Sequence, residues 1–137
     1  MGSQGSQLPT RAVFVALLVL LAGCGSASEP RADALKPMTV AEVLDDAEVG
    51  DYLRIDAALF TSRGEVQLCD EPAGDSMPMY CAEPPGYLVM TAAPLDDLGL
   101  REQEDSGELS GGVDVVVKLT DSRTVEFVED ARDVESR

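Results

Sequence analysis

The sequence predicts a mainly β domain, a small barrel of five short strands that follows one short helix. Three observations support this prediction. Apolar residues alternate with polar ones in several short runs, turn residues separate those runs, and a longer connection lies between the third and fourth runs. Because closing a sheet into a barrel removes exposed strand edges, strands of this kind favour a barrel. The chain has 137 residues, 45% of them apolar, which suffices for one compact domain.

Residues 1–23 are predicted to form an export signal. A charge-free apolar run occupies residues 12–21, with Arg11 before it and the small residues Ala22 and Gly23 after it. This layout is typical of a secretory signal. A membrane-spanning helix needs about 20 apolar residues, roughly twice the length of this run, so we expect no permanent transmembrane span.

The signal ends in Leu21-Ala22-Gly23-Cys24, which resembles the lipobox of bacterial lipoproteins. The resemblance implies that the Cys24 thiol receives a diacylglycerol and that a peptidase cuts just before it. Two acyl chains give lasting attachment, so we expect a lipid anchor in the cell membrane on its extracytoplasmic face. Two alternatives remain. In the first, the signal is cut elsewhere and Cys24 is an ordinary residue. In the second, Gly2 is myristoylated, which would leave the apolar run without a function.

Residues 25–37 are predicted to form a flexible tether, so that Cys24 and the tether together span residues 24–37. The segment has two prolines and no apolar period. Its root-mean-square span is about 20 Å, which would hold the domain, residues 38–130, close to the membrane.

A short helix is predicted over residues 40–48. Thr39 and Glu42 have the spacing of a capping box, in which each side chain bonds the other residue's backbone N–H. Apolar residues follow at helical spacing, and Gly50 ends the run. The alternative interpretation is a turn.

The strands follow from a switch to a period of two. Alternation predicts a first strand over residues 53–60, a turn at 61–64 and a second strand around 66–68. Residues 87–91 form a third run rich in strand formers.

The second half of the domain contains two further predicted strands. We expect a helical turn at 94–100, a polar stretch at 101–112, and the clearest strand at 113–119. A turn at 121–123 then leads to a fifth strand over 125–127. Residues 131–137 are expected to be a charged, frayed tail.

Several of these segments are similar to small actinobacterial lipoproteins with an OB-like barrel, most of which have no assigned activity. The similarity covers about residues 39–128. It rests on Val66-Gln67-Leu68-Cys69, the loop that leads to Cys81 and the late valine-rich hairpin. It implies a five-stranded OB-like barrel and no particular function.

Cys69 and Cys81 remain once Cys24 carries lipid. An even number of cysteines in an exported chain predicts one disulfide, which would stabilise the fold by about 3 kcal/mol. A redox pair and two free thiols are the alternatives; catalytic pairs are usually two residues apart.

Two kinds of metal site are conceivable. Met77 and Met79 offer soft ligands to Cu(I), although methionines in such a loop also serve as adaptable packing. Loop carboxylates suggest Ca²⁺, but they lack the ligand order of a known calcium loop. These carboxylates are Asp70, Glu71, Asp75, Glu102, Glu104, Asp105 and Glu108.

Composition argues against catalysis and against nucleic acid. The chain has no histidine and no nucleophile elbow, so we expect no enzyme and no cofactor. With 26 acidic and 10 basic residues, a net charge of −16, it lacks the basic face that phosphates require. The sequence thus predicts a membrane-anchored, non-enzymatic binding module for an unknown protein or cationic partner. A metal-handling lipoprotein is the alternative.

Overall fold

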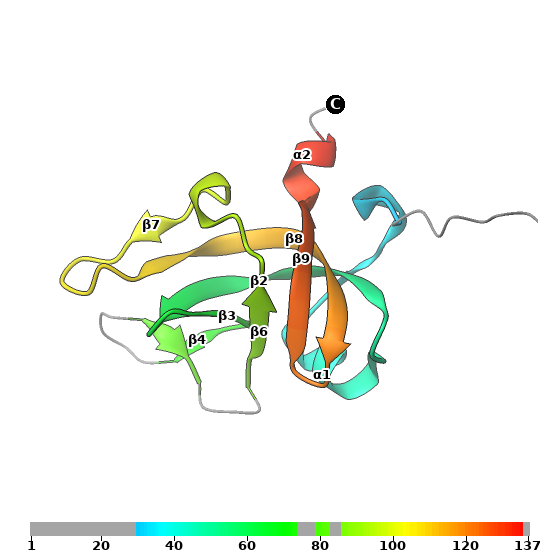
Figure 1. Cartoon of the computed structure of the whole chain (residues 1–137), viewed down its shortest axis with the longest axis horizontal. Coiled ribbons are helices and arrows are strands. Elements are labelled where there is room, and N and C mark those ends of the chain that lie inside the picture. Colours follow the sequence, from blue (N-terminus) through cyan, green and yellow to red (C-terminus); the bar gives the residue numbers. More distant parts are fainter. Residues whose placement is uncertain (1–29, 74–78, 83–85, 136–137) are drawn as a thin grey trace, which may run out of the picture.

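The computed structural model describes residues 30–73, 79–82 and 86–135. Five of its strands close a barrel, two others pair as a separate two-stranded sheet, and short helices lie beside the barrel (Figure 1). In chain order the elements are η1 (Ala32–Ala34), β1 (Pro37–Met38), α1 (Val40–Asp46), β2 (Tyr52–Ser62), β3 (Glu65–Cys69), β4 (Pro72–Ala73), β5 (Tyr80–Cys81), β6 (Leu88–Thr91), η2 (Leu95–Asp97), β7 (Arg101–Glu102), β8 (Leu109–Asp121), β9 (Thr124–Asp130) and α2 (Ala131–Glu135). Each helix in these ranges is too short or too polar to cross a membrane.

Five strands close the barrel in the order β2, β3, β6, β9, β8, and β8 pairs back onto β2. The β2–β8 ladder is antiparallel and runs from Tyr52 opposite Lys118 to Phe60 opposite Ser110. Strands β6 and β9 are parallel, and the remaining barrel pairings are antiparallel. The predicted five-stranded OB-like barrel is therefore confirmed.

Alternation along the strands fills the barrel interior. Ile55 on β2 lies opposite Val115 on β8, and both are fully buried, whereas their neighbour Asp56 is exposed. Helix α1 contributes Val40 and Val43 to the same core. The capping box predicted from Thr39 and Glu42 is present, which explains why α1 begins where it does.

The N-terminal segment differs from the prediction. Residues 24–37 are predicted to be lipidated cysteine and tether, but the described part of that range forms η1 and begins β1, which pairs in parallel with β2. Ala32 is 1% exposed and packs against Val116 and Ala131. This segment packs on the barrel because Val116 points outward from the barrel wall. Covering the apolar side chain of Val116 with the N-terminal segment removes it from water.

The predicted charged tail also differs, because β9 continues to Asp130 and α2 follows directly. Ala131 is fully buried in the cluster with Ala32. Arg132 bonds Asp130 and the backbone oxygen of Leu98, so the start of α2 is tied to the barrel.

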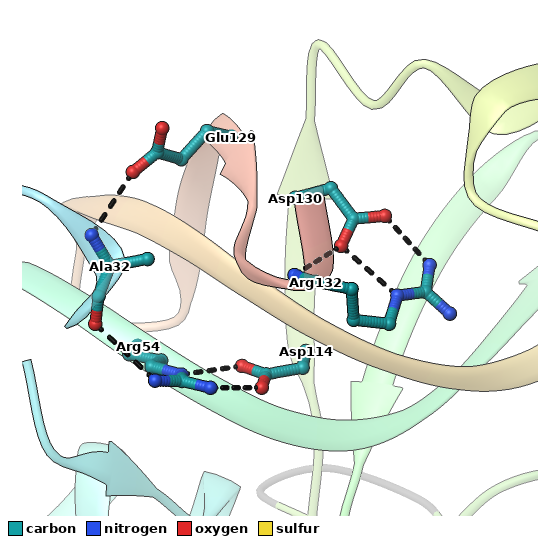
Figure 2. A network of polar contacts seen from close by, with 6 residues as sticks. All are labelled: Ala32, Arg54, Asp114, Glu129, Asp130 and Arg132. Atoms are coloured by element: carbon teal, nitrogen blue, oxygen red, sulfur yellow. Dashed lines mark hydrogen bonds and ion pairs between the residues drawn. The ribbon is translucent and has the colours of Figure 1, made fainter. Parts of the chain in front are cut away.

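Polar contacts complete this second layer, as Figure 2 shows. The backbone N–H of Ala32 donates to Glu129, and its carbonyl oxygen accepts from Arg54. The Arg54 guanidinium in turn donates two hydrogen bonds to Asp114 on the neighbouring strand. We call the contacts of Ala32 with Arg54, Val116, Glu129 and Ala131 the N-terminal clasp.

The crossover between the third and fourth barrel strands contains η2 where a helical turn is predicted, and Leu98 beside it is buried in the core. The polar stretch predicted over 101–112 is shorter, because Arg101–Glu102 and Leu109–Ser110 pair as β7 and the start of β8.

Candidate functional site

The predicted disulfide between Cys69 and Cys81 is present, and it joins the end of β3 to β5. The two sulfurs form a small apolar cluster with Phe60, against which Met79 and Tyr87 pack. Phe60 and Cys69 lie on the outer face of the barrel wall, since the adjacent Leu59 and Leu68 fill the interior. The disulfide therefore holds β5 over the outside of β2 and β3.

A buried glutamine fixes the same segment from its other side. Gln103 is only 5% exposed and is the one buried polar residue in the described part of the chain. Its side-chain oxygen accepts from the Met79 backbone N–H at 2.8 Å, and its amide donates to the Met79 carbonyl at 3.2 Å. The backbone entering β5 is thus positioned by the disulfide and by Gln103 together.

Between this segment and β3 lies an open groove of about 450 Å³, within the roughly 300–1,000 Å³ typical of small-ligand sites. Strand β3 forms its floor and β5 one wall, and the β2–β3 turn and the residue before β6 form its ends. We call this the β3–β5 groove, and it is lined by Ser62, Arg63, Glu65, Gln67, Tyr80, Cys81, Ala82 and Tyr87.

The floor of the groove carries an internal hydrogen bond. The Gln67 amide donates to a Glu65 carboxylate oxygen at 2.9 Å, which orients both side chains on the outer face of β3. Among the lining residues that the structure describes, Arg63 is the one base and Glu65 the one acid, so these two charges balance. The described lining is polar, on a strongly acidic protein.

Two tyrosines give the groove its aromatic surface. Tyr80 is 51% exposed, an unusual position for a large ring. Tyr87 is half-buried, and the Arg123 guanidinium lies 5.0 Å from the centre of its ring. Arg123 makes no ion pair within the described residues, and its buried Nε has no hydrogen-bond partner there. The guanidinium therefore packs against the Tyr87 ring as a cation–π contact.

The Arg63 end of the groove is a tight hairpin turn supported by Glu108, the residue before β8. Arg63 and Gly64 both have positive φ, as a type I′ hairpin turn requires, and Gly64 adopts this without strain. Glu108 accepts from the Thr61 hydroxyl at 2.6 Å and from the Arg63 backbone N–H at 3.1 Å. The hydrogen bond from Thr61, and then that from Arg63, holds the pKa of Glu108 below its usual value.

A second cleft, of about 690 Å³, lies between α1 and the β8–β9 turn and includes Leu44, Asp70 and Arg123. Within this cleft, the Asp70 carboxylate already accepts from the backbone N–H groups of Val40 and Ala41 at the start of α1. The β3–β5 groove has more polar side chains converging on one space, and so it is the better candidate.

The predicted methionine ligands lie only partly within the described residues, so the copper site stays a prediction. Met79 packs against the disulfide cluster, while Met77 and Asp75 lie outside the described residues. Among residues 30–73, 79–82 and 86–135, no three acidic, cysteine or histidine side chains come together around a common point. Cys24 and the export signal also lie outside the described residues.

Sequence reasoning missed the residues that shape the groove. In the sequence, Tyr80 and Tyr87 are two aromatic residues of an acidic chain, and Gln103 is an uncharged residue among glutamates. Nothing in their local sequence predicts that they shape a groove. Their roles depend on pairing between distant segments. Comparisons with protein-family models, with curated proteins and with solved structures each find no match for this chain.

Proposed function

We propose that this protein is a membrane-anchored, extracytoplasmic lipoprotein whose OB-like domain is a non-enzymatic binding module. In this proposal Cys24 carries the lipid and the β3–β5 groove is the binding face. The observation that carries it is the Cys69–Cys81 disulfide, which builds one wall of the groove. Structural disulfides persist in oxidising compartments, which agrees with export directed by the lipobox-like end of the signal.

A binding role fits the chemistry of the groove better than catalysis. Among the described lining residues Ser62 is the one aliphatic hydroxyl, and the chain has no histidine to activate it. Glu65 is the one carboxylate in that described lining, where acid–base work would need two. The described side chains can therefore hold and orient a ligand.

The anchor is tested by comparing Cys24→Ser with Cys81→Ser in a bacterial host that processes lipoproteins. We expect the native chain in the membrane fraction after a high-salt wash, with an intact mass that includes a diacylglycerol. Cys24→Ser should lose both properties, and Cys81→Ser should keep both. A native chain that stays in the cytosol with residues 1–23 attached would contradict the proposal.

A further inference from the structure

We infer that the end of the domain that carries the N-terminal clasp faces the membrane, and that the β3–β5 groove opens away from the membrane. The inference rests on the proposed lipid anchor at Cys24 and adds the orientation of the domain above the bilayer. It makes the ligand of the groove a molecule of the extracytoplasmic space and not a lipid of the supporting membrane. Three lengths decide the orientation: those of the anchor segment, the domain and strand β2.

The clasp sets the point at which the anchor segment, residues 25–32, is fixed to the domain. The backbone of Ala32 is hydrogen-bonded to Glu129 and to Arg54, and its side chain is only 1% exposed. Whatever path the segment takes, its eight residues span at most about 29 Å. Ala32 therefore lies within about 29 Å of the lipidated residue Cys24.

The clasp and the groove lie at opposite ends of strand β2. Arg54, which bonds Ala32, is the third residue of β2, and Ser62, which lines the groove, is its last. The eight residues from Arg54 to Ser62 correspond to about 26 Å along the strand. Figure 1 shows η1 and the β2–β3 turn on opposite sides of the domain. The groove is thus remote from the point at which the anchor segment is fixed.

These lengths disfavour an inverted domain. A compact domain of about 100 residues is about 34 Å across. For the groove to face the bilayer, the clasp would stand about 26–34 Å above it, which needs a nearly straight anchor segment or exceeds its reach. The opposite orientation places no such demand on the segment.

The clasp is what imposes this limit. Without it, the first fixed point is Pro37, which pairs with β2 and lies thirteen residues after Cys24. The reach then becomes about 47 Å, more than the width of the domain, and either orientation is possible. The packing of Ala32 therefore orients the groove.

The test uses the full lipidated chain in phosphatidylcholine vesicles that carry dansyl on a fraction of the headgroups. Neutral lipid is used so that repulsion of the acidic chain does not by itself produce the result. The chain has no tryptophan, so a single introduced tryptophan reports its distance from the headgroups by energy transfer to dansyl. Asp33→Trp places this probe at an exposed position of η1, and Tyr80→Trp places it at the exposed edge of the groove.

We expect energy transfer from position 33 to be at least about threefold more efficient than from position 80, because the two positions differ in height by tens of ångströms. Equal transfer from the two positions in vesicle-bound protein would overturn the inference and leave the lipid anchor intact. A chain that does not float with the vesicles would instead contradict the anchor itself, so the two failures are distinguishable.

A further pair of variants tests the clasp. In the Tyr80→Trp protein, Ala32→Asp should release the clasp and raise transfer from position 80 by about twofold or more. Asp33→Ala changes the exposed neighbour, leaves the clasp intact and should leave that transfer unchanged. Melting curves show that each variant is folded. Unchanged transfer in a folded, vesicle-bound Ala32→Asp variant would show that the clasp does not orient the groove, which overturns the inference.

Discussion

Gln103 bonds both backbone groups of Met79, accepting from its N–H and donating to its carbonyl. The pair connects the crossover before β8 to the segment that enters β5, 24 residues apart in the chain. This buried position favours a side chain that can both accept and donate. An apolar side chain of the same size would leave the N–H and the carbonyl of Met79 without partners.

Gln103→Leu should therefore destabilise the protein by about 1–3 kcal/mol through the unpaired N–H and carbonyl of Met79. Urea unfolding of the two proteins measures the difference. Gln67→Leu is the matched control, because Gln67 is partly exposed and bonds only a side chain, and its loss should be smaller. Equal losses in the two variants would show that the Met79 contact adds no stability.

Removing the disulfide should lower the free energy of unfolding by about 3 kcal/mol, the value expected for a loop of this length. The cysteines are 12 positions apart, and the double variant Cys69→Ala, Cys81→Ala keeps their small apolar volume. Because the barrel ladder does not include β5, the fold should persist while amides of residues 79–82 exchange faster with solvent. Unchanged exchange in that segment would show that Gln103 alone holds the groove wall.

The barrel was predictable because its signals are local. Alternation at Ile55 and Val115, the capping box at Thr39 and the turn around Arg63 each lie within a few residues, and each is found in the structure. The disulfide was predictable because the cysteine count, together with the predicted export, leaves few pairings.

The outer layer and the groove were not predictable in the same way. Ala32 and Ala131 show no periodic pattern, and each is buried only because the outward-facing Val116 lies between segments almost a hundred residues apart in the chain. The groove combines β3, β5 and the residue before β6, so its lining is defined by strand pairing and by the disulfide. No local pattern in a single sequence predicts which distant segments will lie side by side to form the groove.

The N-terminal clasp gives a third prediction. Ala32→Asp places a carboxylate in an apolar cluster and beside Glu129, so it should cost about 2 kcal/mol or more. Thermal unfolding at pH 7 measures the loss. The neighbouring Asp33 is exposed, so Asp33→Ala should change the melting temperature little. If Ala32→Asp melts like the native protein, residues 31–35 do not pack on the barrel.

The hydrogen bonds of Glu108 predict a dependence of stability on pH. They hold its pKa in the folded protein below the usual value of 4.5, so the unfolded chain binds its proton first as the pH falls. The stabilisation is therefore fully present above pH 4.5 and is lost as the pH falls through the lower pKa of the folded state. Glu108→Gln should melt at a lower temperature than the native protein at pH 7, and the gap should narrow as the pH falls below 4.5.

The quantity to compare is the difference in melting temperature between the native protein and Glu108→Gln. Acidification also relieves repulsion among the 26 acidic residues, which changes both melting temperatures. That relief acts on both proteins and largely cancels in the difference. Glu104→Gln removes one negative charge from an exposed position in the same segment and controls for net charge. A gap for Glu108→Gln that stayed constant from pH 7 to pH 3 would mean that its carboxylate is not bonded to Thr61 and Arg63 in solution.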